Sequence, residues 1–282
     1  MTRPIVDLVE TDASAAGALL EPFDEQTAFD VAAGRRALFA LRTTPDEPAV
    51  GSAVLGDGAL DLDIREEWRA RGLGGEVAAQ LLARAGDGPL TAWSHEDHPA
   101  ARALAARFGF EAARTLLQLR LEPLPAGGER GEGARLDGSV QLGAFRPGAD
   151  DAEWLALNAR VFAWHPEQGG MTADDLAQRV AEPWFDAGDF LVARDGRGAM
   201  VGYNWLKVEP GGTGEVYVIG VAPEAAGRGL GRALMNAGLD RLRARGCTAV
   251  ELYVESDNTA AVRLYRGLGF TDAAVHVQYS RA

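Results

Sequence analysis

Two short patterns occur twice in this chain of 282 residues, in the same order and at nearly the same distance. Arg71-Gly72-Leu73-Gly74 returns as Arg228-Gly229-Leu230-Gly231, 157 residues later, and Phe108-Gly109-Phe110 returns as Leu268-Gly269-Phe270, 160 residues later. Residues 99–104, just before the second pattern, align with residues 259–264. A period near 160 residues is too long for a solenoid repeat and has the size of a whole domain. The sequence therefore predicts a tandem duplication of one domain.

The stretch between the two copies is rich in proline, glycine and charged residues over residues 122–133. Such a composition buries little apolar surface and is typical of a linker. We therefore predict an N-terminal domain over residues 1–122, a linker over residues 123–138 and a C-terminal domain over residues 139–282.

The C-terminal half alternates between helical and strand patterns. Residues 214–221 are rich in β-branched side chains, and leucines at helical spacing mark residues 229–245, which Gly246 ends. This mixture predicts an α/β fold, a sheet with helices packed on it. Helices are expected at 150–162, 229–245 and 258–266, and strands at 190–194, 199–208, 214–221, 249–255 and 273–279.

The composition limits the class of partner. The formal net charge is −13, and a surface this acidic repels nucleic acids and anionic membranes, so we expect a cationic or neutral small molecule instead. One cysteine excludes an internal disulfide, and the histidines do not form a zinc-binding pattern, so no metal is expected. No apolar run reaches the roughly 20 residues of a membrane helix, and the N-terminus has no signal-peptide pattern. We expect a cytoplasmic monomer.

The strand at 214–221 leads through a glycine-rich turn into the long helix that follows Gly229. Glycines let the backbone take positive φ angles and let a ligand come close. The free amides and the positive dipole end of the helix start form an anion site that a pyrophosphate fits. A tight turn with packing glycines would give the same pattern, so this feature alone leaves both interpretations open.

Two motifs together resemble the GNAT superfamily of acetyltransferases. Its turn pattern, Gln/Arg-x-x-Gly-x-Gly/Ala, matches Arg69, Gly72 and Gly74 in full, whereas the second copy has Ala226 in the first place. Residues 258–270 resemble the N-x-x-A-x-x-L-Y-x-x-x-G-F segment of the superfamily. The resemblance covers nearly the whole chain, once per half. It implies two tandem GNAT (acyl-CoA N-acyltransferase) domains, each a mixed, mostly antiparallel sheet flanked by helices.

The resemblance also implies acetyl-CoA as the co-substrate and indicates where it binds. The family's third strand carries a bulge that splays the sheet and lets the pantetheine arm pair with the strand, while amides of the turn hold the pyrophosphate. In the C-terminal copy the implied residues are Ile219, Gly220, Val221, Ala226, Gly227, Arg228, Gly229, Leu230, Gly231, Arg232, Asn258, Thr259, Ala260, Ala261, Val262 and Arg263. In the N-terminal copy they are Leu62, Asp63, Ile64, Ala70, Arg71, Gly72, Leu73, Gly74 and Gly75.

Acetyl transfer to an amine needs a general base for the ammonium and a general acid for the leaving thiolate. Glu215 starts the cofactor strand, and Tyr265 stands where the family usually has a tyrosine that reaches the CoA sulfur. A solvated carboxylate and a packing aromatic are the alternatives. The matching positions in the first copy are Gly58 and Ala105, so we predict that only the C-terminal domain is catalytic.

An acetyl-cysteine intermediate would need a reactive thiol. Cys247 follows a helix at the start of a strand, and no histidine is near it in the sequence. We therefore expect a buried packing residue there and direct transfer in a ternary complex.

Three segments narrow the range of possible acceptor substrates. Residues 162–172, 204–208 and 214–221 resemble the HPEQGG loop, the W-x-K strand end and the GEVYVxGV strand of actinobacterial tandem GNAT enzymes. Those enzymes acetylate the cysteinyl amine of a cysteine–glucosamine–inositol conjugate. This resemblance implies that the residues in contact with the acceptor are Glu25, Glu167, Lys207, Glu215 and Tyr253.

Two other functions stay open from the sequence. The chain could acetylate another small amine or a peptide N-terminus, or it could sense acetyl-CoA without turnover. The N-terminal copy fits a sensor by itself, whereas Glu215 and Tyr265 favour an enzyme for the whole chain.

Overall fold

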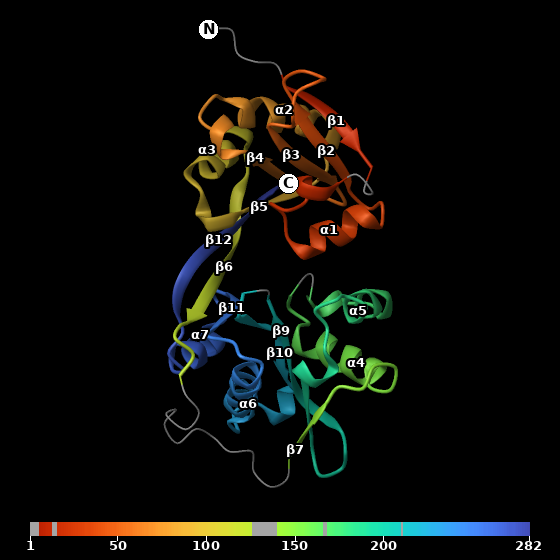
Figure 1. The fold of residues 1–282 in the computed structure, drawn as a ribbon, viewed down its shortest axis with the longest axis vertical. Coiled ribbons are helices and arrows are strands. Elements are labelled where there is room, and N and C mark those ends of the chain that lie inside the picture. Colours follow the sequence, from red (N-terminus) through yellow and green to blue (C-terminus); the bar gives the residue numbers. More distant parts are fainter. Residues whose placement is uncertain (1–5, 13–15, 126–139, 166–167, 210) are drawn as a thin grey trace. The chain divides into compact units, whose positions relative to one another are not determined.

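The structure is a computed structural model that describes residues 6–12, 16–125, 140–165, 168–209 and 211–282. The chain divides into two compact units. The first unit comprises Met1–Leu116 and Val275–Ala282, and the second comprises Leu117–Ala274. Figure 1 shows both units as layered arrangements of strands and helices.

The first unit is built on a mixed sheet. Four antiparallel strands lead to a parallel neighbour, which in turn pairs antiparallel with the last strand of the chain. Along the sheet the strands are β1 (Asp7–Thr11), β2 (Ala37–Arg42), β3 (Gly51–Gly56), β4 (Ala59–Ile64), β5 (Leu90–Ser94), the end of β12 (Thr271–Arg281) and the start of β6 (Glu111–Leu121).

Helices cover both faces of this sheet, and successive side chains of β2 point alternately to one face and to the other. Leu38 packs with α1 (Glu25–Ala32), whereas Phe39 and Leu41 pack with α2 (Leu73–Ala85). The third helix, α3 (Pro99–Phe108), follows β5.

The second unit repeats this plan. Along its sheet lie the start of β12, the end of β6, β11 (Ala249–Glu255), β10 (Thr213–Val221), β9 (Met200–Val208), β8 (Phe190–Arg194) and β7 (Gln141–Ala144). Only the β10–β11 pair is parallel among the strand pairs from β7 to β11. The predicted fold class, a mixed and mostly antiparallel sheet flanked by helices, is confirmed.

The helices of the second unit lie in two layers (Figure 1). On one face α6 (Leu230–Ala244) and α7 (Thr259–Arg266) pack against Leu206, Val216 and Leu252 of the sheet. On the other face α4 (Asp151–Val161) and α5 (Ala173–Val180) cover the part of the sheet that carries Trp205. The predicted helices and strands of this half lie within two residues of these bounds.

The division of the chain differs from the predicted boundary at residue 122. Strand β6 leaves the first unit at Leu116, and its continuation places Leu119 and Leu121 in the core of the second unit. Strand β12 does the reverse and completes the first unit with Val275–Ala282. The predicted linker also begins later, because the Leu124 amide donates to the Thr248 carbonyl at 2.7 Å. Residues 126–138 of that linker lie outside the described residues.

The backbone repeats where the sequence does. Gly72 and Gly229 have φ angles of 81° and 80°, and each stands just before the long helix of its unit. Gly109 and Gly269, 160 residues apart, have φ angles of 74° and 96°. Both pairs occupy the left-handed region that favours glycine. The duplicated motifs are therefore duplicated turns.

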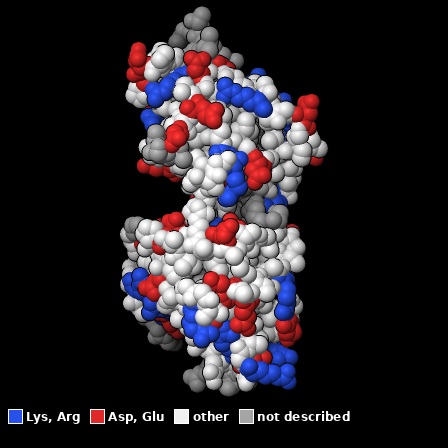
Figure 2. All heavy atoms as spheres, turned by 90° about the vertical axis from the view of Figure 1, so that its right-hand side faces the viewer, with Lys and Arg blue, Asp and Glu red and all other residues white. Residues whose placement is uncertain are grey.

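The surface of each unit carries both signs of charge. Figure 2 shows acidic and basic side chains interspersed on the face that it presents. In the part of the chain that the structure describes, no helix is long and apolar enough to cross a membrane. Nor do any three His, Cys, Asp or Glu side chains of those residues come together as metal ligands would.

Candidate active site

Strands β10 and β11 part in the middle of the second unit's sheet. Their pairing runs from Thr213 opposite Ala249 to Val216 opposite Leu252, and ends there. The register of β10 against β9 shifts between Val216 and Val218, so Tyr217 is the extra residue of a β-bulge. The bulge that the family resemblance implied is confirmed.

Beyond the bulge, Ile219, Gly220 and Val221 pair with β9 alone. The opposite backbone edge of these residues is therefore available to an extended ligand, as at the edge of a sheet. Gly220 has a packing reason as well, because a Cβ there would lie 2.5 Å from the Tyr203 hydroxyl. In the first unit β4 also parts from β5, with Ala59 opposite Thr91 as the pair between them, but its register against β3 has no shift and hence no bulge.

The turn after β10 presents the start of α6. Gly227 and Gly229 have φ angles of 76° and 80°, and the amides of the first helical turn have no partners within the helix. In the first unit Ala70 and Gly72 have φ angles of 59° and 81°. Ala226, which stands where the family's turn pattern has Gln or Arg, leaves this backbone geometry unchanged. Both turns can accept a pyrophosphate.

Small residues bring the neighbouring helices close to these turns. A Cβ at Gly231 would lie 3.7 Å from Leu264 of α7, and one at Gly74 would lie 3.5 Å from Leu104 of α3. Leu104 and Leu264 are equivalent residues of the repeat. A Cβ at Gly75 would lie 2.6 Å from the Arg107 guanidinium.

Substitution of Gly229 by Ala should weaken acetyl-CoA binding. An Ala in the left-handed region costs roughly 1–2 kcal/mol, which the turn can relieve by moving its amides. We expect the KM for acetyl-CoA to rise about tenfold, since each 1.4 kcal/mol is a factor of ten. Steady-state kinetics at varied acetyl-CoA concentration measures this KM. Gly198→Ala is the matched control, because Gly198 has a φ of 86° in a hairpin turn with open space around it.

Helix α7 carries the second predicted motif. The Asn258 side chain caps it by accepting from the Ala261 amide at 3.2 Å, and His98 caps the equivalent α3 through the Ala100 amide. Tyr265 is buried, and it packs in the same core cluster as Leu252 and Val254, near the point where β10 and β11 part. Burial raises the pKa of Tyr265 to about 12.

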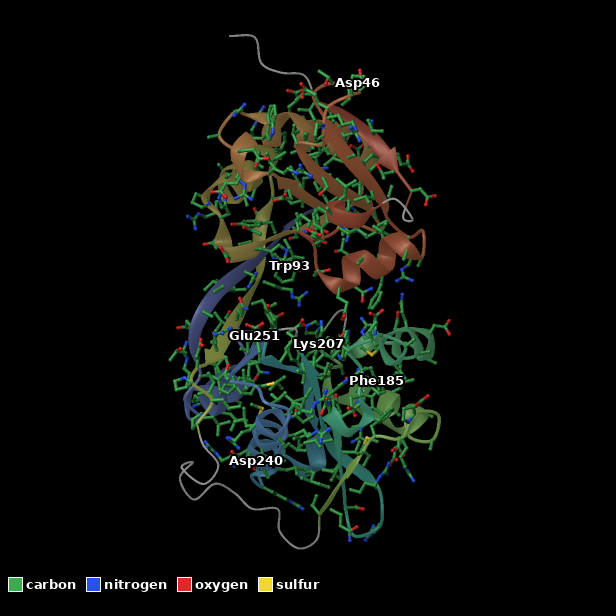
Figure 3. All side chains as sticks on the ribbon, viewed as in Figure 1. Asp46, Trp93, Phe185, Lys207, Asp240 and Glu251 are labelled. Carbon is green, nitrogen blue, oxygen red and sulfur yellow. The ribbon has the colours of Figure 1, made fainter. Side chains whose placement is uncertain are left out.

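Polar side chains follow three neighbouring strands on the face opposite α6. Glu215 of β10 is directly opposite Lys207 of β9 and Glu251 of β11, so the three side chains share one face. Tyr253, two residues after Glu251, lies on the same face. We call Lys207, Glu215, Glu251 and Tyr253 the polar face. Figure 3 shows Lys207 and Glu251 at the same end of this sheet.

Lys207 is held from two sides. Its Nζ lies 3.0 Å from a Glu209 carboxylate oxygen and 5.1 Å from the centroid of the Trp184 ring. A compact ammonium suits a site that offers both a carboxylate and an aromatic face.

The carboxylates around Tyr253 affect its pKa. Its pKa is raised to about 12, first by burial and then by the negative charges of Glu215, Glu251 and Glu209. The hydroxyl therefore stays protonated and able to donate at neutral pH, while the residue remains 43% exposed to solvent.

The loop after α4 is anchored by its own motif. Asn158 donates to the Gln168 carbonyl at 2.6 Å, and the Gln168 amide donates to His165 Nδ1 at 3.1 Å. His165 Nε2 then faces a Glu255 oxygen at 3.8 Å. Gly169 is needed for space, because a Cβ there would lie 2.2 Å from the Phe162 carbonyl oxygen. These contacts keep His165, Gln168 and Gly169 next to the end of α4.

The remaining predicted residues lie elsewhere. Glu167 falls outside the described residues. Glu25 begins α1 in the first unit, after the Asp24 cap. In that unit Gly58 lies in the turn before β4 and Ala105 is buried in α3, at the positions that match Glu215 and Tyr265. Cys247 is buried, as expected, and burial raises its thiol pKa.

Sequence reasoning missed Glu251. Its signal was present in the alternation of β11, where Glu251, Tyr253 and Glu255 interleave with the core residues Val250 and Leu252. A period of two with polar side chains on one face marks a sheet surface that a second helix layer does not cover. Only the register with β10 shows that Glu251 lies beside Glu215.

Comparison with known proteins places this geometry in a family. Residues 158–270 match the model of the Acetyltransferase (GNAT) family. A mycothiol acetyltransferase from Clavibacter sepedonicus is 49% identical over 93% of this chain and 86% of its own length. The one from Thermobispora bispora is 46% identical over 98% of this chain and 95% of its own.

Solved structures agree on the fold. A tandem GNAT protein from the clavulanic acid biosynthesis pathway superposes with a TM-score of 0.72 at 19% identity and covers 98% of both chains. A GCN5-related N-acetyltransferase from Sphaerobacter thermophilus gives a TM-score of 0.68 at 19% identity, over 98% of this chain and 95% of its own. With two GNAT units, a bulged cofactor strand and relatives of this identity, the chain is an acyltransferase that belongs to the mycothiol acetyltransferase family.

Proposed function

We propose that this acetyltransferase transfers the acetyl group of acetyl-CoA to the cysteinyl amine of a cysteine–glucosamine–inositol conjugate, the last step of mycothiol biosynthesis. The observation that carries the proposal is the polar face, where Glu215 lies between Lys207 and Glu251 next to the bulge of β10. Carboxylates can hold an ammonium, and Lys207 and Tyr253 can donate to sugar hydroxyls. The names of the relatives support this acceptor.

The residues present fit acetyl-CoA, which would supply the activated acetyl thioester. The left-handed turn at Gly227 and Gly229 and the start of α6 suit its pyrophosphate. The free edge of Ile219, Gly220 and Val221 suits the pantetheine amides. We assign the other predicted cofactor residues of the C-terminal turn and of α7 to the same site.

Glu215 is the proposed general base. It takes a proton from the acceptor ammonium, directly or through a water, and the neutral amine then attacks the thioester carbonyl. The C–N bond forms and the C–S bond breaks. The nitrogen loses two protons in all. One offsets the proton that the leaving thiolate takes up, and the other passes to solvent. A backbone amide of β10 stabilises the developing oxyanion.

Tyr265 is the proposed general acid. Because burial raises its pKa to about 12, the hydroxyl keeps its proton across the physiological range and can give it to the thiolate. For Tyr265→Phe we expect kcat to fall on the order of 100-fold, with the KM values nearly unchanged.

The pH profile tests the same assignment. A neutral phenol is lost only as pH rises through its folded pKa, so the wild-type kcat should not fall near pH 10, where an unperturbed tyrosine would be half ionised. The residual kcat of the Tyr265→Phe variant should likewise stay constant on the alkaline side of the profile. A wild-type decline near pH 10 that the variant lacks would contradict the raised pKa.

We assign catalysis to the C-terminal domain and propose that the N-terminal domain, which keeps the glycine turn but has Gly58 and Ala105, does not acetylate. Its residues 62–64 and 70–75 form a second acetyl-CoA site in this proposal. Glu25 and Glu167 remain proposed acceptor contacts. We also propose that the protein works as a monomer in the cytoplasm, without a metal.

One experiment separates the candidate functions. Purified protein is incubated with acetyl-CoA and the cysteinyl conjugate, and CoA release is followed with a thiol reagent. Stoichiometric CoA release with acetylation of the amine supports the proposal. Turnover on a peptide N-terminus or another small amine alone would favour the wider acetyltransferase function. Binding of acetyl-CoA without any release would favour a sensor.

A further inference from the structure

We infer that Glu251 is the residue that binds the ammonium form of the acceptor, next to Glu215, and thereby sets the preference of the site for cationic amines. The inference rests on the proposed function and adds a residue to it. It assigns binding to one carboxylate and proton removal to the other.

The register of the strands brings the two carboxylates together. Glu215 and Glu251 are directly opposite residues of the parallel β10–β11 pair, and both point away from the α6 face. Neighbouring parallel strands lie about 4.8 Å apart. An ammonium placed between the two side chains can therefore donate to both.

Glu251 is fixed in place but keeps a free oxygen. Gln118 Nε2 donates to its Oε2 at 3.1 Å, and the Arg120 guanidinium lies 3.4 Å from the same oxygen. Both contacts come from β6 and fall on Oε2. Among the described residues, Oε1 has no such contact, and the side chain keeps 18% of its exposure.

The local charges favour a cationic ligand. Arg120 has a closer partner in Glu122, at 2.8 Å against 3.4 Å for Glu251. Like charges directly opposite on one sheet face repel each other, so the pair Glu215 and Glu251 gains from a cation that bridges it.

The acceptor's chemistry matches this need. An ammonium has three donors, which suits two carboxylates and leaves one for a water or hydroxyl. Hydrogen bonds between charged groups are the strong ones. Once Glu215 has removed a proton, the amine is neutral and its attraction to Glu251 weakens, which frees it to attack. Glu251 thus binds the ground state more than the product.

The duplicated domain provides an internal comparison. At the offset of 160, Thr91 of β5 corresponds to Glu251, and Gly58 corresponds to Glu215 at the offset of 157. The first unit therefore lacks both carboxylates at the matching positions. The pair is present only in the unit to which we assign chemistry.

The test is Glu251→Gln, which keeps the shape and removes the charge. We expect the KM for the cysteinyl conjugate to rise about tenfold or more, as for a lost charge-assisted hydrogen bond. We expect kcat to change by less than about threefold and the KM for acetyl-CoA to stay the same. The inhibition constant of the N-acetylated product, which has no ammonium, should also stay the same.

Asp240→Asn is the matched control. It removes the carboxylate partner of Arg243 on α6, at a residue whose side chain is 61% exposed and which lies on the other face of the sheet from the polar face. Its kinetic constants should equal those of the wild type. Glu251→Asp, which keeps the charge on a shorter chain, should give an intermediate KM and remains informative if the Gln variant folds poorly.

Three results would overturn the inference. The KM for the conjugate could stay unchanged in Glu251→Gln, kcat could fall instead of the KM rising, or product inhibition could weaken as much as acceptor binding. The last result would indicate a purely structural role. A wild-type protein that does not acetylate the conjugate would refute the proposed function instead, and the same comparison would then be made with the amine that it does acetylate.

Discussion

Substitution of Glu215 by Gln should lower kcat at neutral pH by about 10²–10⁴, the usual effect of removing a positioned general base. The KM for acetyl-CoA should change far less, whereas the KM for the conjugate should rise by about tenfold, because the ammonium also donates to Glu215 in the proposed complex. Glu215 qualifies because it lies on β10 just before the bulge at Tyr217, where the cofactor strand parts from β11. Single-turnover measurements of CoA release at saturating substrates give the rate directly.

The pH dependence makes this prediction specific. An α-amino group has a pKa of about 7.7–8.0, so above roughly pH 9 the acceptor has already lost its proton to solvent. The deficit of Glu215→Gln should therefore shrink as pH rises. Asp240→Asn, at an exposed residue of α6, should show wild-type rates at every pH. A deficit that stays constant up to about pH 9 and beyond, or a kcat that is intact at neutral pH, would contradict the role of Glu215 as base.

Removal of residues 275–282 should unfold the first unit and leave the second folded. These residues form the end of β12, which pairs with β5 from Val277 opposite Ser94 to Arg281 opposite Leu90. The loss removes five strand pairs and the buried Val277 side chain, whose burial alone contributes about 1.5–3 kcal/mol. Since a domain is stable by only about 5–15 kcal/mol, a loss of this size should be visible as unfolding.

Hydrogen exchange resolves the two units. Amides of β2 to β5 should lose protection in the truncated chain, whereas amides of β9 to β11 should keep it. A chain that lacks only Ala282, which follows the end of β12, is the control and should behave as the full chain does. Uniform loss of protection in both units, or none in either, would contradict the division of β12 between them.

The local features of this fold could be predicted from the sequence. The repeated glycines occur at positions whose φ angles are positive in both copies, as at Gly72 and Gly229, and the residue type follows from that local conformation. Strands β8 to β12 follow from their own patterns, whereas β6 and β7 were not expected from the sequence. For the same reason the cofactor turn was predicted, although Ala226 departs from the motif.

The position of each unit's last strand could not be predicted in this way. Strand β6 begins in the first unit and ends in the second, and β12 does the reverse. Each strand is continuous over its whole length of 11 residues. Which neighbour each half pairs with depends on the sheet edge that is left open, and that edge is formed by residues far away in the chain.

The site shows the same division. Glu215, Tyr265 and the glycine turn could be read from the amino-acid order alone, because each belongs to a continuous motif whose spacing fixes its place on a strand or helix. The folded chain was needed to show that Glu251 of β11, held by Gln118 of β6, lies beside Glu215 of β10. The physical reason is strand register: it is set by the packing of Leu119, Val216 and Leu252 on the opposite face, and no short stretch of sequence contains it.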